Sequence, residues 1–158
     1  MTLKDRLRSD LTTAMKARDD DQSKVRVATL RMALAAISTE EVSGAQARVL
    51  TDDEVVVVLA REAKKRRESA EAYQSADRPE LAAAELAELA VLQGYLPEQL
   101  SEVDLVAIIE AAVASASADG AAGMKAMGAV MKIVQPQVRG RADGTLVAEL
   151  VKARLSAS

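Results

Sequence analysis

The sequence contains no cysteine, histidine, tryptophan or phenylalanine. These absences exclude a thiol nucleophile, an imidazole base, a zinc site built from cysteine and histidine, and disulfide bonds. The only aromatic residues are Tyr73 and Tyr95, too few to stack successive bases as single-strand binding proteins do. Most familiar catalytic arrangements are therefore ruled out, and we expect neither a cofactor nor a metal.

Glycine and proline are also scarce, with seven and three residues in a chain of 158. This is about half of their usual share. Because these residues interrupt helices, and because alanine, leucine, glutamate, lysine and arginine are abundant, the composition predicts helices. We expect an all-α protein with no sheet, long enough for one domain or two small ones.

Capping signals and apolar spacing predict seven helices. The run Val55–Val58 would by itself be typical of a strand. However, Thr51 and Glu54 just before it form a capping box, in which each side chain satisfies a backbone N–H at the start of a helix. We therefore expect a helix that runs from this cap to about Tyr73.

A domain boundary is expected near residues 97–100. Gly94-Tyr95-Leu96-Pro97 ends the fourth predicted helix, and Ser101 caps the next one. The sequence thus predicts an N-terminal helical domain of about four helices over residues 1–97. A C-terminal three-helix bundle is expected over residues 98–158.

Charge is nearly balanced over the whole chain, where 21 basic residues stand against 24 acidic ones. Residues 120–158, by contrast, hold 6 basic and 2 acidic groups. Any nucleic-acid site must therefore be local. The longest uncharged stretch is the nine residues of Leu89–Pro97, far short of the ~18 that cross a bilayer. With no apolar signal core at the N-terminus, we expect a cytoplasmic protein outside the membrane.

Five cations occur in the seven residues Arg61-Glu62-Ala63-Lys64-Lys65-Arg66-Arg67. Helix geometry pairs three of them with a glutamate four residues away, as Glu62–Arg66, Lys64–Glu68 and Arg67–Glu71. Arg61 and Lys65 are left over, one turn apart and of like charge. A solvated helix face is the simpler interpretation of the segment, but if it binds a ligand, these two residues do so.

The segment Gly123-Met124-Lys125-Ala126-Met127-Gly128-Ala129-Val130-Met131 is not a P-loop, because Ala129 and Val130 follow its second glycine in place of lysine and serine or threonine. Small residues at 123 and 128 are typical of close helix packing, with the methionines filling the core. A glycine inside a helix costs ~1 kcal/mol relative to alanine. We therefore expect something close to the Gly128 backbone that compensates for this cost.

Arg139 and Arg141 lie in a glycine-flanked loop between the last two predicted helices, where Asp143 is expected to cap the final helix. Two guanidinium groups beside a helix start suit a phosphate, because the helix N-terminus adds positive potential. Two solvated loop arginines are an equally good interpretation. Together with Lys125 and Lys132, these arginines are the candidate phosphate contacts.

Four segments carry a resemblance when taken in order: REAKKRRES at 61–69, YLPEQLS at 95–101, MGAVM at 127–131, and GRADG at 140–144 followed by Leu146-Val147. They resemble the YqeY-like family, which shares a C-terminal module with the B subunit of the glutamine-dependent aspartyl/glutamyl-tRNA amidotransferase. The resemblance covers nearly the whole chain. It implies an all-α protein of two parts, whose C-terminal part is similar to the amidotransferase tail that grips the outer corner of tRNA.

The resemblance implies a non-catalytic protein that binds the tRNA backbone, or that assists an amidotransferase or aminoacyl-tRNA synthetase. The catalytic cradle of the amidotransferase has no counterpart here, so a carbon–nitrogen ligase activity would belong to the neighbouring domain. The chain departs from the family at Gln135-Pro136-Gln137, where a basic residue is common. A helical protein–protein interaction module is the alternative, and an independent enzyme is the third, although no pair of carboxylates stands out for it.

Overall fold

The computed structural model describes residues 1–17 and 20–157, and every regular element in these ranges is a helix. They contain seven α-helices and one short 3-10 helix. The prediction of an all-α fold with seven helices and no strand is confirmed for this part of the chain. The chain divides into two compact units, Met1–Leu96 and Pro97–Ser158, which are described separately below.

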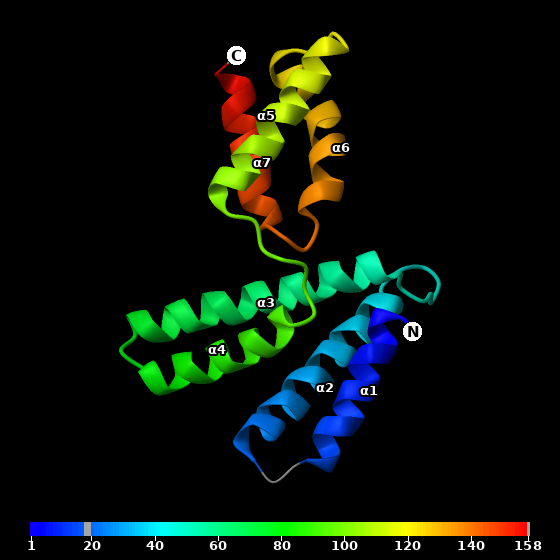
Figure 1. The fold of residues 1–158 in the computed structure, drawn as a ribbon, viewed down its shortest axis with the longest axis vertical. Helices are drawn as coiled ribbons and strands as arrows, with labels where there is room; N and C mark the ends of the chain where they lie inside the picture. The colour runs from blue at the N-terminus through cyan, green and yellow to red at the C-terminus, as the bar shows by residue number, and fades with distance from the viewer. Residues whose placement is uncertain (18–19, 158) are drawn as a thin grey trace. The chain divides into compact units, whose positions relative to one another are not determined.

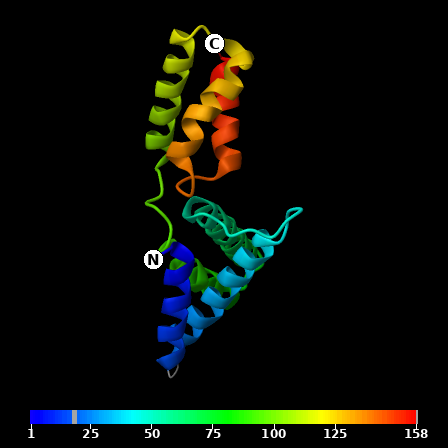
Figure 2. The same cartoon turned by 90° about the vertical axis from the view of Figure 1, so that its right-hand side faces the viewer.

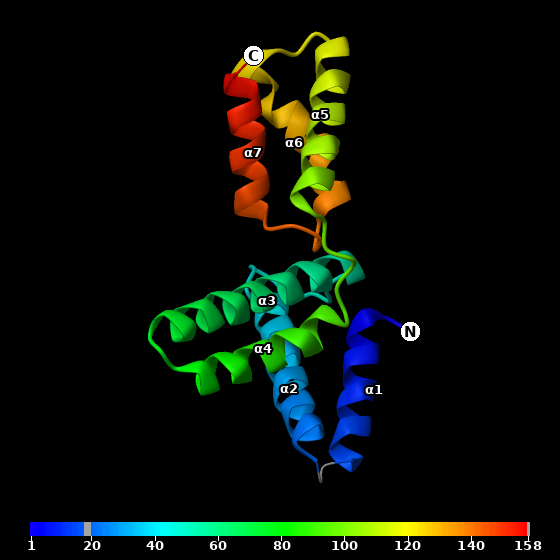
Figure 3. The same cartoon turned by 60° about the vertical axis from the view of Figure 1, so that its left-hand side comes forward.

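The first unit consists of two helical hairpins that cross each other (Figures 1 and 3). Its helices are α1 (Leu3–Lys16), α2 (Asp21–Glu41), α3 (Asp52–Ser75) and α4 (Pro79–Gln93). The core is aliphatic, and its most buried large side chains are at most 1% exposed: Leu7, Leu30, Ile37, Val55, Leu59 and Leu92. Apolar burial of this kind is the dominant favourable contribution to folding.

The start of α3 shows why four consecutive valines are helical. The Thr51 hydroxyl accepts a hydrogen bond from the backbone N–H of Glu54 at 3.3 Å, and the Glu54 carboxylate accepts one from the N–H of Thr51 at 2.8 Å. Val55 and Val58 then face the core, while Val57 faces solvent. The predicted capping box is confirmed, and it outweighs the strand preference of the valines.

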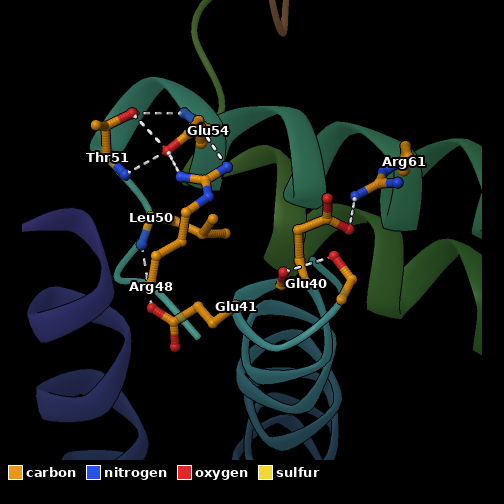
Figure 4. A network of polar contacts seen from close by, with 8 residues as sticks. Glu40, Glu41, Arg48, Leu50, Thr51, Glu54 and Arg61 are labelled. Carbon is orange, nitrogen blue, oxygen red and sulfur yellow. Dashed lines mark hydrogen bonds and ion pairs between the residues drawn. The ribbon is translucent and has the colours of Figure 1, made fainter. Parts of the chain in front are cut away.

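The loop between α2 and α3 is exposed but held at both ends (Figure 4). The Glu41 carboxylate accepts from Lys4 Nζ and from the backbone N–H of Leu50. The Arg48 guanidinium donates to both Glu54 oxygens, at 2.9 and 2.7 Å. Hydrogen bonds from Arg48 and from the Thr51 backbone lower the pKa of Glu54 to about 2. Above that pH the carboxylate stays ionised and keeps its hold on Arg48.

Tyr95 fastens the end of α4 to the first hairpin. Its ring is buried, and its hydroxyl donates to Asp10 Oδ2 at 2.5 Å and accepts from Arg26 Nη2 at 2.9 Å. The Arg6 guanidinium lies over the ring, 4.8 Å from its centroid. One side chain therefore joins residues of α1 and α2 to the end of α4. Burial, together with the hydrogen bond to Asp10, raises the pKa of Tyr95 to about 12.

The second unit is a bundle of three α-helices (Figures 2 and 3). It contains α5 (Glu102–Ala118), the 3-10 helix η1 (Gly123–Ala126), α6 (Met127–Val138) and α7 (Gly144–Ser156). Its own core is again aliphatic, with these side chains at most 2% exposed: Leu105, Ile109, Val130, Val134, Val147 and Val151. Asp143 caps α7 as predicted, since its carboxylate accepts from the Thr145 N–H at 3.0 Å.

In the described ranges, no single helix is both long enough and apolar enough to cross a membrane. Taken together, α5 and the η1–α6 segment pass the same test of length and composition, with a bend of 102° between them. Their apolar faces form the core of the second unit. Core helices commonly pass such a test, so the pair carries little weight as a membrane span.

Replacing Tyr95 with phenylalanine should destabilise the first unit without removing its ring contacts. Two hydrogen bonds are lost, which corresponds to about 1–2 kcal/mol of unfolding free energy. The raised pKa gives a second signature: the stabilisation is complete below pH 10 and is lost as the pH rises toward 12. Urea unfolding followed by circular dichroism should show a loss of stability between pH 9 and 11.5 that is smaller in the variant. An equal alkaline loss in both proteins would contradict this assignment.

Candidate nucleic-acid interface

The exposed side of η1 and α6 carries cations and no acidic residue. The sequence from 120 to 142 contains four basic residues and no aspartate or glutamate. Lys125 lies on η1 and Lys132 on α6, and both are exposed. Val130 and Val134 point the other way, into the core. The helix therefore separates an apolar inner side from a basic outer side.

The two lysines are not neutralised by the protein. Within residues 1–17 and 20–157, neither ammonium group has an ion-pair or hydrogen-bond partner. Between them lie Gly128 and Ala129, which are also exposed. The spacing of three to four residues places all of these positions on one side of the helix. The result is an exposed surface of small residues with a lysine at each end.

The interpretation of Gly128 as a site of close helix packing is wrong. A Cβ atom built there would meet nothing within 4 Å, and the same holds at Gly123. The backbone of Gly123 has a φ of 60°, in the left-handed region, which explains glycine at that position. Gly128 has no such explanation within its own unit. Its glycine leaves the helix backbone open to solvent between the two lysines.

The methionines of this segment behave as predicted only in part. Met127 and Met131 are partly buried and pack against the core of the second unit. Met124 is 46% exposed, and its sulfur lies 3.5 Å from the Ser156 hydroxyl. The interpretation as core filling therefore holds for two of the three residues.

The Arg141 guanidinium, on a partly buried residue, is bound by the main chain of its own unit. Its Nε donates to the backbone carbonyl of Glu98 at 3.0 Å, and its Nη1 donates to that of Gln137 at 3.3 Å. The second of these carbonyls belongs to the last turn of α6, which has no helical partner for it. Arg141 therefore supports the loop between α6 and α7 and joins it to the segment before α5.

Backbone contacts reinforce that junction. The N–H of Leu100 donates to the Arg141 carbonyl, and the Gln99 side chain donates to the Gly140 carbonyl, both at 2.8 Å. Gly140 is buried and has a φ of 71°, a conformation that only glycine adopts readily. Arg139 ends α6 on the exposed side and also has a contact within the protein.

Arg61 and Lys65 are not left over in the structure. Arg61 Nη2 lies 3.0 Å from Glu40 Oε2 on α2, as Figure 4 shows, and Lys65 Nζ lies 3.3 Å from Glu62 Oε1. The expectation that these two cations lack partners is wrong, because Glu40 comes from a different helix that local spacing cannot reveal. Arg67 is instead the cation of this run without an ion pair among the described residues.

Arg66 from the same run is part of the interior. It is 6% exposed, and its guanidinium contacts Glu62 at 2.8 Å and Glu88 of α4 at 3.3 Å. The predicted Glu62–Arg66 pair is thus confirmed, as is Lys64–Glu68 at 4.0 Å. Most cations of residues 61–67 therefore form ion pairs within the first unit and do not form an open cationic surface.

No metal centre is visible in the part of the chain that the structure describes. Within those residues, no three carboxylates gather closely enough to hold an ion. On η1 and α6, positive charge lies beside an exposed helix backbone, an arrangement that suits an anionic ligand.

These features define a class of small helical protein with two compact units and a basic outer face on the second. The sequence matches the family described as Yqey-like protein over residues 4–155, so the chain belongs to that family. The family is related to the C-terminal domain of the amidotransferase B subunit. The predicted resemblance is therefore confirmed. No curated protein gives a match to this chain.

Replacing Arg141 with alanine should weaken the second unit. The variant loses two charge-assisted hydrogen bonds to backbone carbonyls, and we expect the free energy of unfolding to fall by about 1–2 kcal/mol. Thermal unfolding followed by circular dichroism measures the change. Arg139→Ala, at an exposed position in the same loop, is the matched comparison and should have a smaller effect. Equal stability of the Arg141→Ala variant and the wild type would show that the two hydrogen bonds are dispensable.

Proposed function

We propose that the protein binds tRNA through its phosphate backbone and does not catalyse a reaction on it. The observation that carries the proposal is the exposed face of η1 and α6, where Lys125 and Lys132 have no partner among the described residues and flank the open backbone of Gly128. Membership of the Yqey-like family, which is related to the amidotransferase C-terminal domain, supports the same ligand.

The chemistry of this face fits a phosphate chain better than it fits bases. Lysine ammonium groups act as mobile point charges, which neutralise phosphates without reading sequence. The second unit contains no tyrosine on which bases could stack. Recognition would therefore depend on the shape and charge of the folded RNA, and the outer corner of tRNA offers a continuous phosphate surface.

In this proposal the arginines of the following loop have different tasks. Arg139 extends the basic face beyond the end of α6, while Arg141 holds the loop in place through its two backbone carbonyls. We propose that residues 1–97 and 98–158 are separate domains, which the two aliphatic cores support. A cytoplasmic protein of this kind would act beside an aminoacyl-tRNA synthetase or an amidotransferase.

Replacing Lys125 and Lys132 together with alanine should weaken tRNA binding by a similar factor for different tRNAs. Each lost phosphate contact removes roughly 0.7–0.9 from the slope of log K against log salt, so the slope should flatten by about 1.5. Fluorescence anisotropy with two labelled tRNAs over a series of salt concentrations measures both quantities. A selective loss for one tRNA would contradict recognition through phosphates.

Arg61→Ala with Lys65→Ala is the matched control, since it also removes two cations but from an ion-paired site in the first unit. We expect binding to be unchanged. If this double variant alone loses affinity, the site lies on the first unit and the proposal for η1 and α6 is wrong. If the wild type shows no salt-dependent binding to any tRNA, the protein–protein alternative takes its place.

Gly128→Ala should change stability and binding in opposite directions. No atom lies within 4 Å of the added methyl group, so the helix should gain about 1 kcal/mol or less in stability. The same methyl group would keep an RNA backbone away from the helix, and tRNA affinity should fall. Thermal unfolding and anisotropy on the same protein preparation test the two effects. Higher stability with unchanged affinity would show that the RNA does not approach this backbone.

A further inference from the structure

The helices α5 and α7 of the second unit lie side by side and run in the same direction (Figure 3). Near their starts, the Leu100 N–H donates to the Arg141 carbonyl at 2.8 Å. Further along, Arg154 Nε donates to Glu110 Oε1 at 2.6 Å. These two contacts fix how the residues of one helix are aligned with those of the other.

Four apolar side chains occupy the outer side of this helix pair before the Glu110–Arg154 contact. Two helical turns before each partner lie Val103 and Leu146, which are 79% and 40% exposed. One turn before lie Val106, 42% exposed, and Leu150, which is partly buried. We call Val103, Val106, Leu146 and Leu150 the α5–α7 apolar face. Valines and leucines grouped near solvent on two adjacent helices are a candidate for contact with another molecule.

The charges around the α5–α7 apolar face are negative. Glu102 lies four residues from Val106, and Glu149 lies three residues from Leu146, which places each carboxylate beside the face. Both are exposed, and within residues 1–17 and 20–157 neither forms an ion pair. The cation beside the face, Arg154, is neutralised by Glu110. The proposed RNA-binding face on η1 and α6 has the opposite sign.

We propose that the α5–α7 apolar face docks a basic amphipathic helix of a partner protein. A third helix can pack its apolar side against such a face on two parallel helices at the usual interhelical distance. The carboxylates of Glu102 and Glu149, which have no ion pair in the part of the chain that the structure describes, favour lysine or arginine on the flanks of that helix. They also disfavour other occupants, because nucleic acid and anionic lipid are repelled. A second copy related by two-fold symmetry would bring the same carboxylates together.

This inference does not depend on tRNA binding, because it uses neither Lys125 nor Lys132. The probe is a synthetic, fluorescein-labelled peptide of about five helical turns, with leucine along one side and lysine on both flanks. Its counterpart carries glutamate in place of every lysine. Anisotropy titrations with the full-length protein should show binding of the lysine peptide, weakening with salt, and no binding of the glutamate peptide.

Val103→Ser with Leu146→Ser should weaken binding of the lysine peptide at least about tenfold, since both anchors lose their apolar contact. Glu102→Gln with Glu149→Gln should weaken it about threefold and reduce the salt dependence. Val42→Ser removes a valine that is 65% exposed in the first unit and should leave binding unchanged. Circular dichroism verifies that each variant is folded.

Three results would overturn the proposal. The first is equal binding of the lysine peptide to wild type and to the Val103→Ser, Leu146→Ser variant. The second is equal binding of the lysine and glutamate peptides, which would mean unspecific apolar contact. The third is a wild-type dimer in analytical ultracentrifugation that this variant converts to monomer, because a second copy would then cover the face. Unchanged tRNA binding by the variant would keep the two proposed sites distinct.

Discussion

The arrangement of the second unit rests on one junction, at which the chain before α5 is hydrogen-bonded to the loop between α6 and α7. Gly140 turns the chain with a positive φ, and its carbonyl accepts a hydrogen bond from the Gln99 side chain. Arg141 then returns hydrogen bonds to Glu98 and to the end of α6. Together with the aliphatic core shared by the three helices, this junction ties the start of α5 to the loop between α6 and α7.

The fold could be predicted from the sequence because its signals are local. The capping box at Thr51 and Glu54 is a contact over three residues, and it identified a helix where four valines suggested a strand. Asp143 was recognisable as a cap for the same reason. The packing of one helical hairpin on the other could not be predicted in this way. The contact of Tyr95 with Asp10 joins residues far apart in the sequence, so no local sequence pattern reveals it.

The candidate site was less predictable because ion pairs with residues distant in the sequence decide which cations remain available. Spacing along a helix showed the partner of Arg66 but not the Glu40 that reaches Arg61 from α2. Arg141 is a residue type that commonly binds phosphate, yet its guanidinium donates a hydrogen bond to the backbone carbonyl of Glu98. The segment from 120 to 142 contains no acidic residue, a feature that the sequence displays directly, and the lysines of η1 and α6 lie on it. Counting cations is therefore informative only where no carboxylate can reach them.

The loop between α2 and α3 is exposed, but hydrogen bonds hold its ends, and this affects how much its length can change. Glu41 and Glu54 hold its two ends through Leu50 and Arg48, whereas the stretch from Gly44 to Ala47 lies in solvent. The entropy of closing a loop grows only slowly with its length, so extra residues there would cost little. The chain should tolerate added residues at this point, or an inserted tag or fluorophore, while the helices on either side keep their register.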